Sequence, residues 1–496
     1  MVNGFLNNSA AMLQTMRNSM RHFAPKKYLP HLALLLITSV LIFYRLNVPQ
    51  ALIFDETYHI PSAQKYLNGV FYQENHPPIG KLLIAFGQLL YGGEIRPDFV
   101  GVEKISAPWP KDFDITGFRI APALFGIFIP LILFLVLKTI TGNTITSWLM
   151  ALLLCFDTAF LMQARIAMLD VFLLFFVFLS TLFFVRAFLT EKPVSFFELA
   201  MFGVVSGCAA NVKDTGLIVL VPFGLLTLKT LRQKSFSQTL SLTSIFLTCF
   251  AITYLGWWLI HFSIANTLYE DKTYKISQEH RDILTGDVAP PNPIRTFYIE
   301  MVDAFKFSKQ YNEGVPALKL GNPEEVGSPW YYWVMGGTAI NYRWETPNGI
   351  DYRYSYLVPN PVTWMVSLLG VIFGSSLVLS DLLYRFLNPG KLKTFLYAFV
   401  TLYWCYIVPF WFIKRVMYLY HYLPAMLLGL ILFAVFVKLA PFKSGHKRSF
   451  IVLLVLIAGI VCLLLLSFIY YQPLTNAEFQ LRNFWPFWKL MCVKCG

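Results

Sequence analysis

Apolar residues fill long stretches of the chain, and short polar segments separate them. Stretches of about 20 residues recur, and a helix of that length crosses the hydrocarbon core of a bilayer. The pattern predicts eleven such helices, at about 29–48, 117–137, 143–160, 168–188, 196–211, 217–230, 239–261, 361–380, 394–412, 418–437 and 450–470. No small-residue cleavage site follows the first run, so we expect a membrane span there and not a cleaved signal peptide.

The composition points the same way. Of the 496 residues, 56% are hydrophobic and 17% are aromatic, and the mean hydropathy is +0.57. A soluble domain does not tolerate this composition, because its surface must be largely polar. The sequence therefore predicts an all-α polytopic membrane protein.

The charges predict the orientation of the helices. Lys and Arg number 40 against 27 Asp and Glu, which gives a net charge of +13. The cations gather in every second loop, as the positive-inside rule describes for the cytoplasmic side. No stripe of Lys and Arg with interleaved aromatic residues points to nucleic acid. We expect the N-terminus inside and, after an odd number of spans, the C-terminus outside.

This orientation divides the chain into segments. We expect a cytoplasmic segment 1–28, a transmembrane catalytic module 29–260 with an outer loop 50–116, a large outer loop 261–360, transmembrane helices 361–471 and an outer tail 472–496. Long loops inside a compact protein are usually functional. We therefore expect the chemistry at the extracytoplasmic face, in two loops that contain short helices.

Two adjacent carboxylates, Asp55 and Glu56, follow the first predicted span in "IFDETYHIPSAQ". A carboxylate beside a phosphate-bearing donor can remove the proton of an attacking hydroxyl while the phosphate leaves. Phosphate needs no proton to leave, so one base suffices, and a single displacement inverts the sugar carbon. The alternative is an interfacial turn or a helix cap without a chemical role.

Further charged residues lie at the outer ends of predicted spans, where they are costly and commonly functional. Arg119, Lys213, Lys414 and Arg415 run against the positive-inside bias, and together they suit a lipid-linked phosphate at headgroup level. Each of them alone could instead snorkel to the headgroups. The other polar candidates at this face are His76 in a rigid His-Pro-Pro turn, Lys81, Asp157, Arg165, Asp170 and His421.

Two other motifs have open interpretations. Trp330 and Trp333 in "SPWYYWVMGG" could stack on a sugar or a peptide, or belong to the aromatic belt of the membrane interface. Cys492 and Cys495 form a terminal CxxC, which alone is weak evidence for a metal or a disulfide. We interpret it as a chance pair.

Six segments, in order along the chain, resemble the protein O-mannosyltransferase family, glycosyltransferase family 39. The first is "FDETYHIPSAQKYLNGVFYQENHPPIGK", which is similar to the first extracytoplasmic loop of the family. The others are "FRIAPALFG", "FDTAFLMQARIAMLDVFLLFF", "NVKDTGL", "GSPWYYWVMGG" and "RVMYLYHYLPAM". The resemblance covers nearly the whole chain.

The resemblance implies the GT-C fold and an inverting transferase. The donor would be a sugar, expected to be mannose, on a polyprenyl phosphate, and the acceptor a Ser or Thr hydroxyl of a translocated protein. Asp55 would be the catalytic base, Glu56 its support and Arg119 a contact of the donor phosphate. We expect further donor contacts from His76, Lys81, Asp157, Arg165, Lys213, Arg415 and His421, and acceptor contacts from Trp330 and Trp333.

Eukaryotic members carry a β-trefoil MIR insertion in the large loop, and this chain shows no repeat of that size there. We therefore expect a bacterial member, in the inner membrane, with the secretion translocon as a candidate partner. A related GT-C transferase acting on lipid A or another glycan stays open, and a transporter or flippase is less favoured because the charges lie at one face. No essential metal is expected, although a divalent ion at Asp55, Glu56 and Asp157 stays open.

Overall fold

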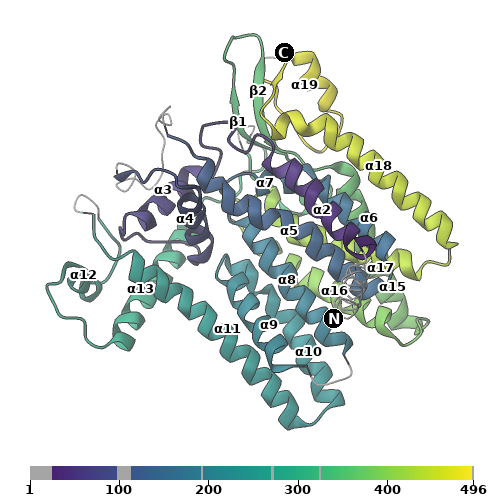
Figure 1. Ribbon diagram of the computed structural model, residues 1–496, viewed down its shortest axis with the longest axis horizontal. Coiled ribbons are helices and arrows are strands. Elements are labelled where there is room, and N and C mark those ends of the chain that lie inside the picture. The colour runs from purple at the N-terminus through teal and green to yellow at the C-terminus, as the bar shows by residue number, and fades with distance from the viewer. Residues whose placement is uncertain (1–24, 98–112, 191–193, 270–272, 323–324, 494–496) are drawn as a thin grey trace, which may run out of the picture.

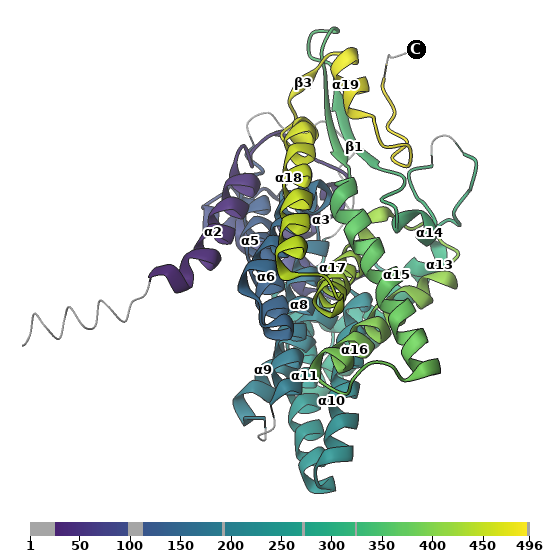
Figure 2. The ribbon, with the colours of Figure 1, turned by 90° about the vertical axis from the view of Figure 1, so that its right-hand side faces the viewer.

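The structure is a computed structural model that describes residues 25–97, 113–190, 194–269, 273–322 and 325–493. Most of segment 1–28 and Cys495 lie outside these residues. The described chain is mainly a bundle of long apolar helices (Figure 1). Figure 2 shows a small sheet at one end of this bundle and, at the other end, the hairpin formed by α10 (Leu220–Gln233) and α11 (Phe236–Ile264).

Eight segments of the described chain are long and apolar enough to cross a membrane. They are α5 (Thr116–Thr141), α8 (Asp170–Leu189), η2 (Asp214–Val219) with α10 (Leu220–Gln233), α11 (Phe236–Ile264), α15 (Pro361–Tyr384), α16 (Lys391–Ile407) with η3 (Val408–Trp411), η4 (Leu419–Tyr422) with α17 (Leu423–Leu439), and α18 (Ser444–Ile469). Two shorter apolar helices, α2 (Pro25–Phe43) and α9 (Phe196–Ala210), match predicted spans. The predicted helical positions are therefore found, whereas the number eleven stays a prediction.

The predicted continuous span 143–160 is wrong in shape. It consists of α6 (Thr144–Cys155) and α7 (Thr158–Ala164), which are bent by 67° at the break between them. Asp157 stands at this break and caps α7, because its carboxylate accepts a hydrogen bond of 2.8 Å from the amide of Phe160. A capping side chain starts a new helix in a new direction.

The two long loops contain short helices, as expected, and also a sheet. The first loop holds α3 (Glu56–Leu67) and α4 (Ile79–Tyr91), and the second holds α12 (Gln278–Thr285), α13 (Pro293–Gly314) and α14 (Trp330–Trp333). Strands β1 (Ile340–Glu345) and β2 (Tyr352–Leu357) form an antiparallel hairpin, which β3 (Pro473–Leu474) extends before α19 (Asn476–Arg482). The all-α expectation missed this sheet. Its signal was Asn348-Gly349, a favoured hairpin turn between two runs of aromatic residues.

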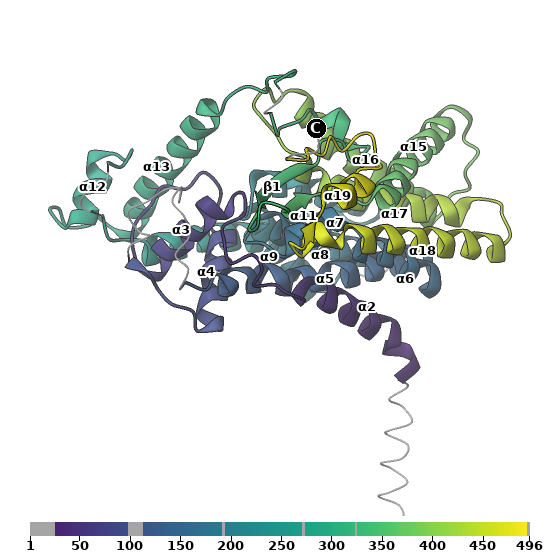
Figure 3. The same cartoon turned by 90° about the horizontal axis from the view of Figure 1, so that it is seen from above.

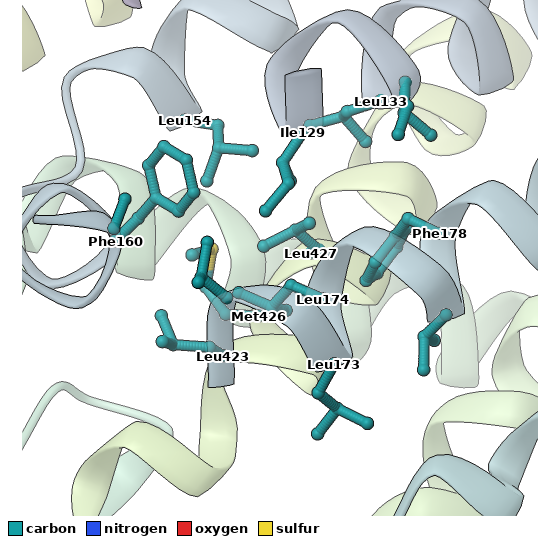
Figure 4. Close-up of a cluster of buried hydrophobic side chains, with 14 of the residues drawn as sticks. Ile129, Leu133, Leu154, Phe160, Leu173, Leu174, Phe178, Leu423, Met426 and Leu427 are labelled. Atoms are coloured by element: carbon teal, nitrogen blue, oxygen red, sulfur yellow. The ribbon is translucent and has the colours of Figure 1, made fainter. Parts of the chain in front are cut away.

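The core lies where α5, α6, α8 and α17 meet. Figure 4 shows apolar side chains from these helices pointing toward one another, among them Ile129, Leu174 and Leu427. Helices α15 and α17 approach closely, since a Cβ on Gly370 would lie 2.1 Å from the carbonyl oxygen of Gly429. At the periphery, α18 leaves an apolar stripe uncovered, including Leu463 at 70% exposure, as a lipid-facing helix would.

Candidate active site

Asp55 lies immediately before α3, in the first loop. It occupies the N-cap position of α3, yet its side chain makes no capping hydrogen bond to the described residues. Instead, the carboxylate receives a hydrogen bond from the hydroxyl of Tyr420. The helix-cap alternative is therefore wrong, and the carboxylate is available for chemistry.

The backbone just before Asp55 is held in an unfavourable conformation. Phe54 has φ = +49°, which lies in the left-handed region that residues other than glycine rarely adopt. Its ring stacks on Tyr342 at 4.6 Å and lies edge-on to Tyr418 at 5.5 Å. Strain of this kind persists only where the surroundings hold it, and it is frequent at functional sites. The aromatic cage around Phe54 thus fixes the direction of Asp55.

The environment of Asp55 raises its pKa to about 6. Burial is the main cause, and the neighbouring Lys213 lowers the pKa in part, while Asp170 raises it and Lys81 lowers it. A carboxylate with this pKa is ionised at pH 7 and is a much better base than an ordinary aspartate. The half-buried Asp55 thus has the acid–base property that a general base requires.

Arg119 holds the neighbouring carboxylate, Glu56. Its guanidinium is 0% exposed, and Nε and Nη2 donate to the two oxygens of Glu56 at 2.8 and 2.7 Å. The three remaining N–H groups donate to the carbonyls of Leu46 (3.4 Å), Pro49 (2.9 Å) and Ala51 (3.0 Å). A guanidinium has five N–H groups, and all five are used. In this arrangement every N–H group of Arg119 is bonded within the protein, so the phosphate contact of Arg119 stays a prediction and its observed partner is Glu56.

Glu56 is equally occupied. Besides Arg119, its carboxylate accepts hydrogen bonds of 2.9 Å from the amides of Ile53 and Ala167. We refer to Glu56 and Arg119, with the segment 46–53 that they hold, as the clamp. The clamp holds the segment that ends at Asp55. We therefore expect Glu56 to position Asp55 and not to contact a substrate.

Two more residues that are predicted to contact the donor are hydrogen-bonded within the protein. The buried Arg165 donates to the carbonyls at the end of α2 and just after it, those of Leu41, Ile42, Tyr44 and Arg45. The buried Asp157 accepts, beyond Phe160, hydrogen bonds from the amide of Asn360 (3.1 Å) and the indole of Trp364 (2.9 Å). Both side chains thus hold neighbouring segments of the fold, and their predicted contacts with the donor stay predictions.

Two lysines near Asp55 are paired with carboxylates. Lys213 Nζ lies 2.8 and 2.9 Å from the two oxygens of Asp170, and it stands 5.3 Å from the centre of the Tyr420 ring. Lys81 is paired with the buried Glu74. Both charges act on Asp55. An ammonium group has three N–H donors, so these pairs leave donors for a phosphate.

The guanidinium of Arg415, unlike that of Arg119, is not hydrogen-bonded to any residue that the structure describes. The side chain is half-buried, and no ion pair joins it to any of these described residues. Its charge lies close enough to His76 to contribute to the low pKa of that imidazole, which burial and Lys213 mainly cause. His76 is therefore neutral and half-buried. We call Asp55, His76 and Arg415 the open face of the site.

His421 and the two tryptophans lie beside the open face. His421 is half-buried, with Nδ1 3.0 Å from the carbonyl oxygen of Tyr418 and its ring stacked on Tyr420 at 4.6 Å. Trp333 is 1% exposed, and its indole donates to the Ser328 hydroxyl at 2.9 Å, so the ring is part of the packing here and its acceptor contact stays a prediction. Trp330 is half-buried and stacks on the exposed Trp411 at 5.1 Å.

The two remaining predictions concern a metal ion and the terminal cysteines. The described residues hold no group of three or more His, Cys, Asp or Glu side chains that could bind a metal ion. Asp157 is taken up by three N–H donors and does not join Asp55 and Glu56. Cys492 is disulfide-bonded, which corrects the interpretation of the terminal cysteines as a chance pair.

Sequence reasoning missed Tyr420 and the cage of Phe54. "RVMYLYHYLPAM" contains three tyrosines, and no pattern distinguishes the one that bonds Asp55 from Tyr418 and Tyr422. Likewise, the strain at Phe54 depends on rings contributed by β1 and by the segment before η4, which are far away in the sequence.

Comparisons with known proteins identify the family of the chain. Residues 32–269 match the profile described as "Dolichyl-phosphate-mannose-protein mannosyltransferase". Residues 309–488 match the "C-terminal four TMM region of protein-O-mannosyltransferase". Both profiles describe parts of the same kind of enzyme, and together they match most of the chain.

Individual relatives match over part of their length. Dolichyl-phosphate-mannose–protein mannosyltransferase 4 of Candida albicans is 27% identical over 295 residues, which are 55% of this chain and 38% of that protein. Protein O-mannosyl-transferase 2 of Danio rerio is 31% identical over 204 residues, 40% of this chain and 26% of that protein. The chain thus spans well under half the length of these relatives.

A solved structure shares the whole fold. The protein O-mannosyltransferase Pmt1–Pmt2 complex of S. cerevisiae, bound to the sugar donor, superposes with a TM-score of 0.81 at 14% identity, over 94% of this chain and 93% of that chain. This likeness confirms the predicted GT-C architecture. With two matching profiles and one fold, the chain belongs to the protein O-mannosyltransferase family.

Proposed function

We propose that the protein transfers a mannosyl group from a polyprenyl-phosphate donor to Ser or Thr hydroxyls of protein acceptors. One observation carries the proposal: the carboxylate of Asp55 makes no capping hydrogen bond, has a pKa of about 6, and lies within reach of the charges of Lys213 and Lys81. Membership of the family supports the sugar, the lipid carrier and the protein acceptor.

The proposed reaction is a single displacement. The ionised Asp55 takes the proton of the acceptor hydroxyl, and the oxygen attacks the anomeric carbon of the mannosyl group. The bond from that carbon to the phosphate oxygen breaks, and the lipid phosphate leaves with the electron pair. Because the attack comes from the face opposite the phosphate, the configuration inverts.

The leaving phosphate is assigned to the open face. Arg415 has uncommitted guanidinium donors, and an arginine can engage a phosphate with two parallel hydrogen bonds. Lys213 and Lys81 add positive charge beside Asp55. The neutral His76 can donate to, or accept from, a sugar hydroxyl. Arg119 acts in this scheme as a positioning residue through Glu56.

We also propose that the site lies on the extracytoplasmic side of a membrane. The positive-inside pattern of the loops supports this orientation. The disulfide at Cys492 agrees with an outer C-terminal tail, because disulfides persist in oxidising compartments. A bacterial inner membrane and an association with the translocon stay predictions from the sequence.

The test is a transfer assay with purified protein. Radiolabelled polyprenyl-phosphate-mannose would be offered with a Ser-containing peptide, with the same peptide carrying Ala in place of Ser, and with lipid A. Label on the Ser peptide alone is the expected result. Label on lipid A would keep the fold and donor but contradict the protein acceptor. If no label moves from this donor to either acceptor, the proposed function is wrong.

A further inference from the structure

A pocket lies near the open face, between the large loop, the hairpin of β1 and β2, and the C-terminal tail. It has a volume of about 470 Å³, within the range of ligand-binding pockets. It is lined by residues 319–322, 325–329, 331 and 332, by Thr338, Ala339 and Asn341 at and just before the start of β1, by Tyr356 of β2, and by Lys489 and Met491. Neither α3 nor the clamp lines it. Figure 2 shows β1 and the tail at one end of the bundle, with α14 lower down at its side.

The walls combine aromatic rings with charges of both signs. Tyr331 and Tyr332 are 50% and 37% exposed, although each has a large apolar ring. The ammonium of Lys489 stands 5.2 Å from the centre of the Tyr332 ring. Lys319 and Glu325 also line the pocket. Rings with a polar tip beside fixed charges suit a polar chain with varied side chains, and not a polyprenol tail.

Two residues of the wall have a strained backbone. Thr338 and Lys489 have φ = +61° and +53°, and both line the pocket. A β-branched residue in the left-handed region is a genuine outlier. The adjacent chain holds them, because Thr338 and Ala339 donate to the carbonyls of Phe487 and Trp488 at 2.9 and 2.8 Å. Such strain is common in ligand clamps.

The pocket adjoins the catalytic aspartate through Tyr418. Tyr418 lies edge-on to Phe54, the neighbour of Asp55. The charges of Asp55 and of the lining residue Glu325 both act on Tyr418, so this ring lies near both carboxylates. The amide of the lining residue Ser328 also donates to the carbonyl of Met417 at 2.9 Å. A chain bound in the pocket can therefore continue toward Asp55.

We propose that this pocket binds the acceptor polypeptide beside the Ser or Thr that receives the sugar. The inference rests on the proposed function and adds the subsite that reads the flanking residues. Lys489, fixed over Tyr332, favours acceptors with acidic side chains next to the accepted hydroxyl, and the exposed tyrosines hold the backbone of the peptide.

The test uses the full chain in detergent and two peptides, each with a single Ser, flanked by Glu in one and by Lys in the other. Lys489→Glu should raise KM for the Glu-flanked peptide by about tenfold and lower it for the Lys-flanked peptide, because charges across an interface set specificity. The kcat, the KM of the donor and the slow transfer to water should not change. Tyr332→Ala should raise KM for both peptides.

The matched control is Lys306→Glu, which reverses an exposed lysine on α13, outside the pocket. Unchanged peptide KM values in both pocket variants would overturn the inference, and so would a change in donor KM alone, which would assign the pocket to the lipid donor.

If the wild type moves no label to either peptide, the proposed function fails, and direct binding of fluorescent peptides decides the inference. Loss of charge-selective binding in Lys489→Glu then supports it, and absence of peptide binding to the wild type overturns it.

Discussion

The clamp and the open face contain the same kinds of residue and differ in how their polar atoms are used. In the clamp, Arg119 uses all five N–H groups and Glu56 accepts from four donors. On the open face, the side chain of Arg415 has no bonded partner among the described residues. Asp55 occupies the N-cap position of α3 without a capping bond, and among the described residues its carboxylate interacts with the Tyr420 hydroxyl.

This difference distinguishes residues that stabilise the fold from residues that can bind a substrate. A buried ion pair with every donor satisfied is rigid, and any ligand would have to break its bonds. A carboxylate or guanidinium with donors and acceptors to spare can bind a substrate without that cost. Adjacent carboxylates, Asp55 and Glu56, therefore have opposite roles although only one peptide bond separates them.

The strongest test compares substitutions at these neighbours. Asp55→Asn should lower the transfer rate by about 10³-fold, which is the range for loss of a general base. The melting temperature of this variant at pH 7 should not fall, because the ionised carboxylate of the wild type is buried at a cost. The raised pKa of Asp55 means that the wild type loses stability as the pH rises from about 4 to 6, and the amide of Asn does not ionise. Glu56→Gln should lower the melting temperature instead. If Asp55→Asn retains full transfer, Asp55 is not the base.

Removing one half of the clamp should destabilise the fold. Arg119→Ala leaves Glu56 buried without its partner, and a broken buried pair costs about 3–5 kcal/mol. Thermal unfolding in detergent measures the loss. The double variant Glu56→Gln with Arg119→Met removes both charges and should recover part of the stability. If Arg119→Ala melts like the wild type but fails to bind donor, the positioning role is wrong.

On the open face, Arg415→Ala should affect binding and leave the fold intact. We expect the KM of the lipid-linked donor to rise by about tenfold to a hundredfold, because a charge-assisted contact to phosphate contributes about 1.5–3 kcal/mol. The melting temperature should be unchanged. Its neighbour Lys414 is exposed, so Lys414→Ala is the matched control. Equal donor KM values in both variants would contradict the phosphate contact.

The sequence predicted the helices and the site's location more completely than the roles within it. Long apolar runs fix where helices form, and "FDETYH" placed Asp55 and Glu56 in the first loop, as observed. Arg119, Arg165 and Arg415 are alike in the sequence, since each is a cation at an outer span end. Their roles depend on which carbonyls and carboxylates lie within 3.4 Å, and those come from segments distant in the chain.

The smallest expected effect is the pH profile, and it sharpens the assignment of the base. With a pKa of about 6, Asp55 is mostly ionised at pH 7 and mostly protonated at pH 5, so transfer should fall by about tenfold per unit below the midpoint. His59 and His76 are two histidines near the site, and burial holds the pKa of both well below the ordinary range. Both imidazoles are neutral at pH 7, so we expect the loss of transfer near pH 6 to follow Asp55. His76→Gln should keep this midpoint, and a midpoint that disappears with that substitution would assign the titration to the histidine.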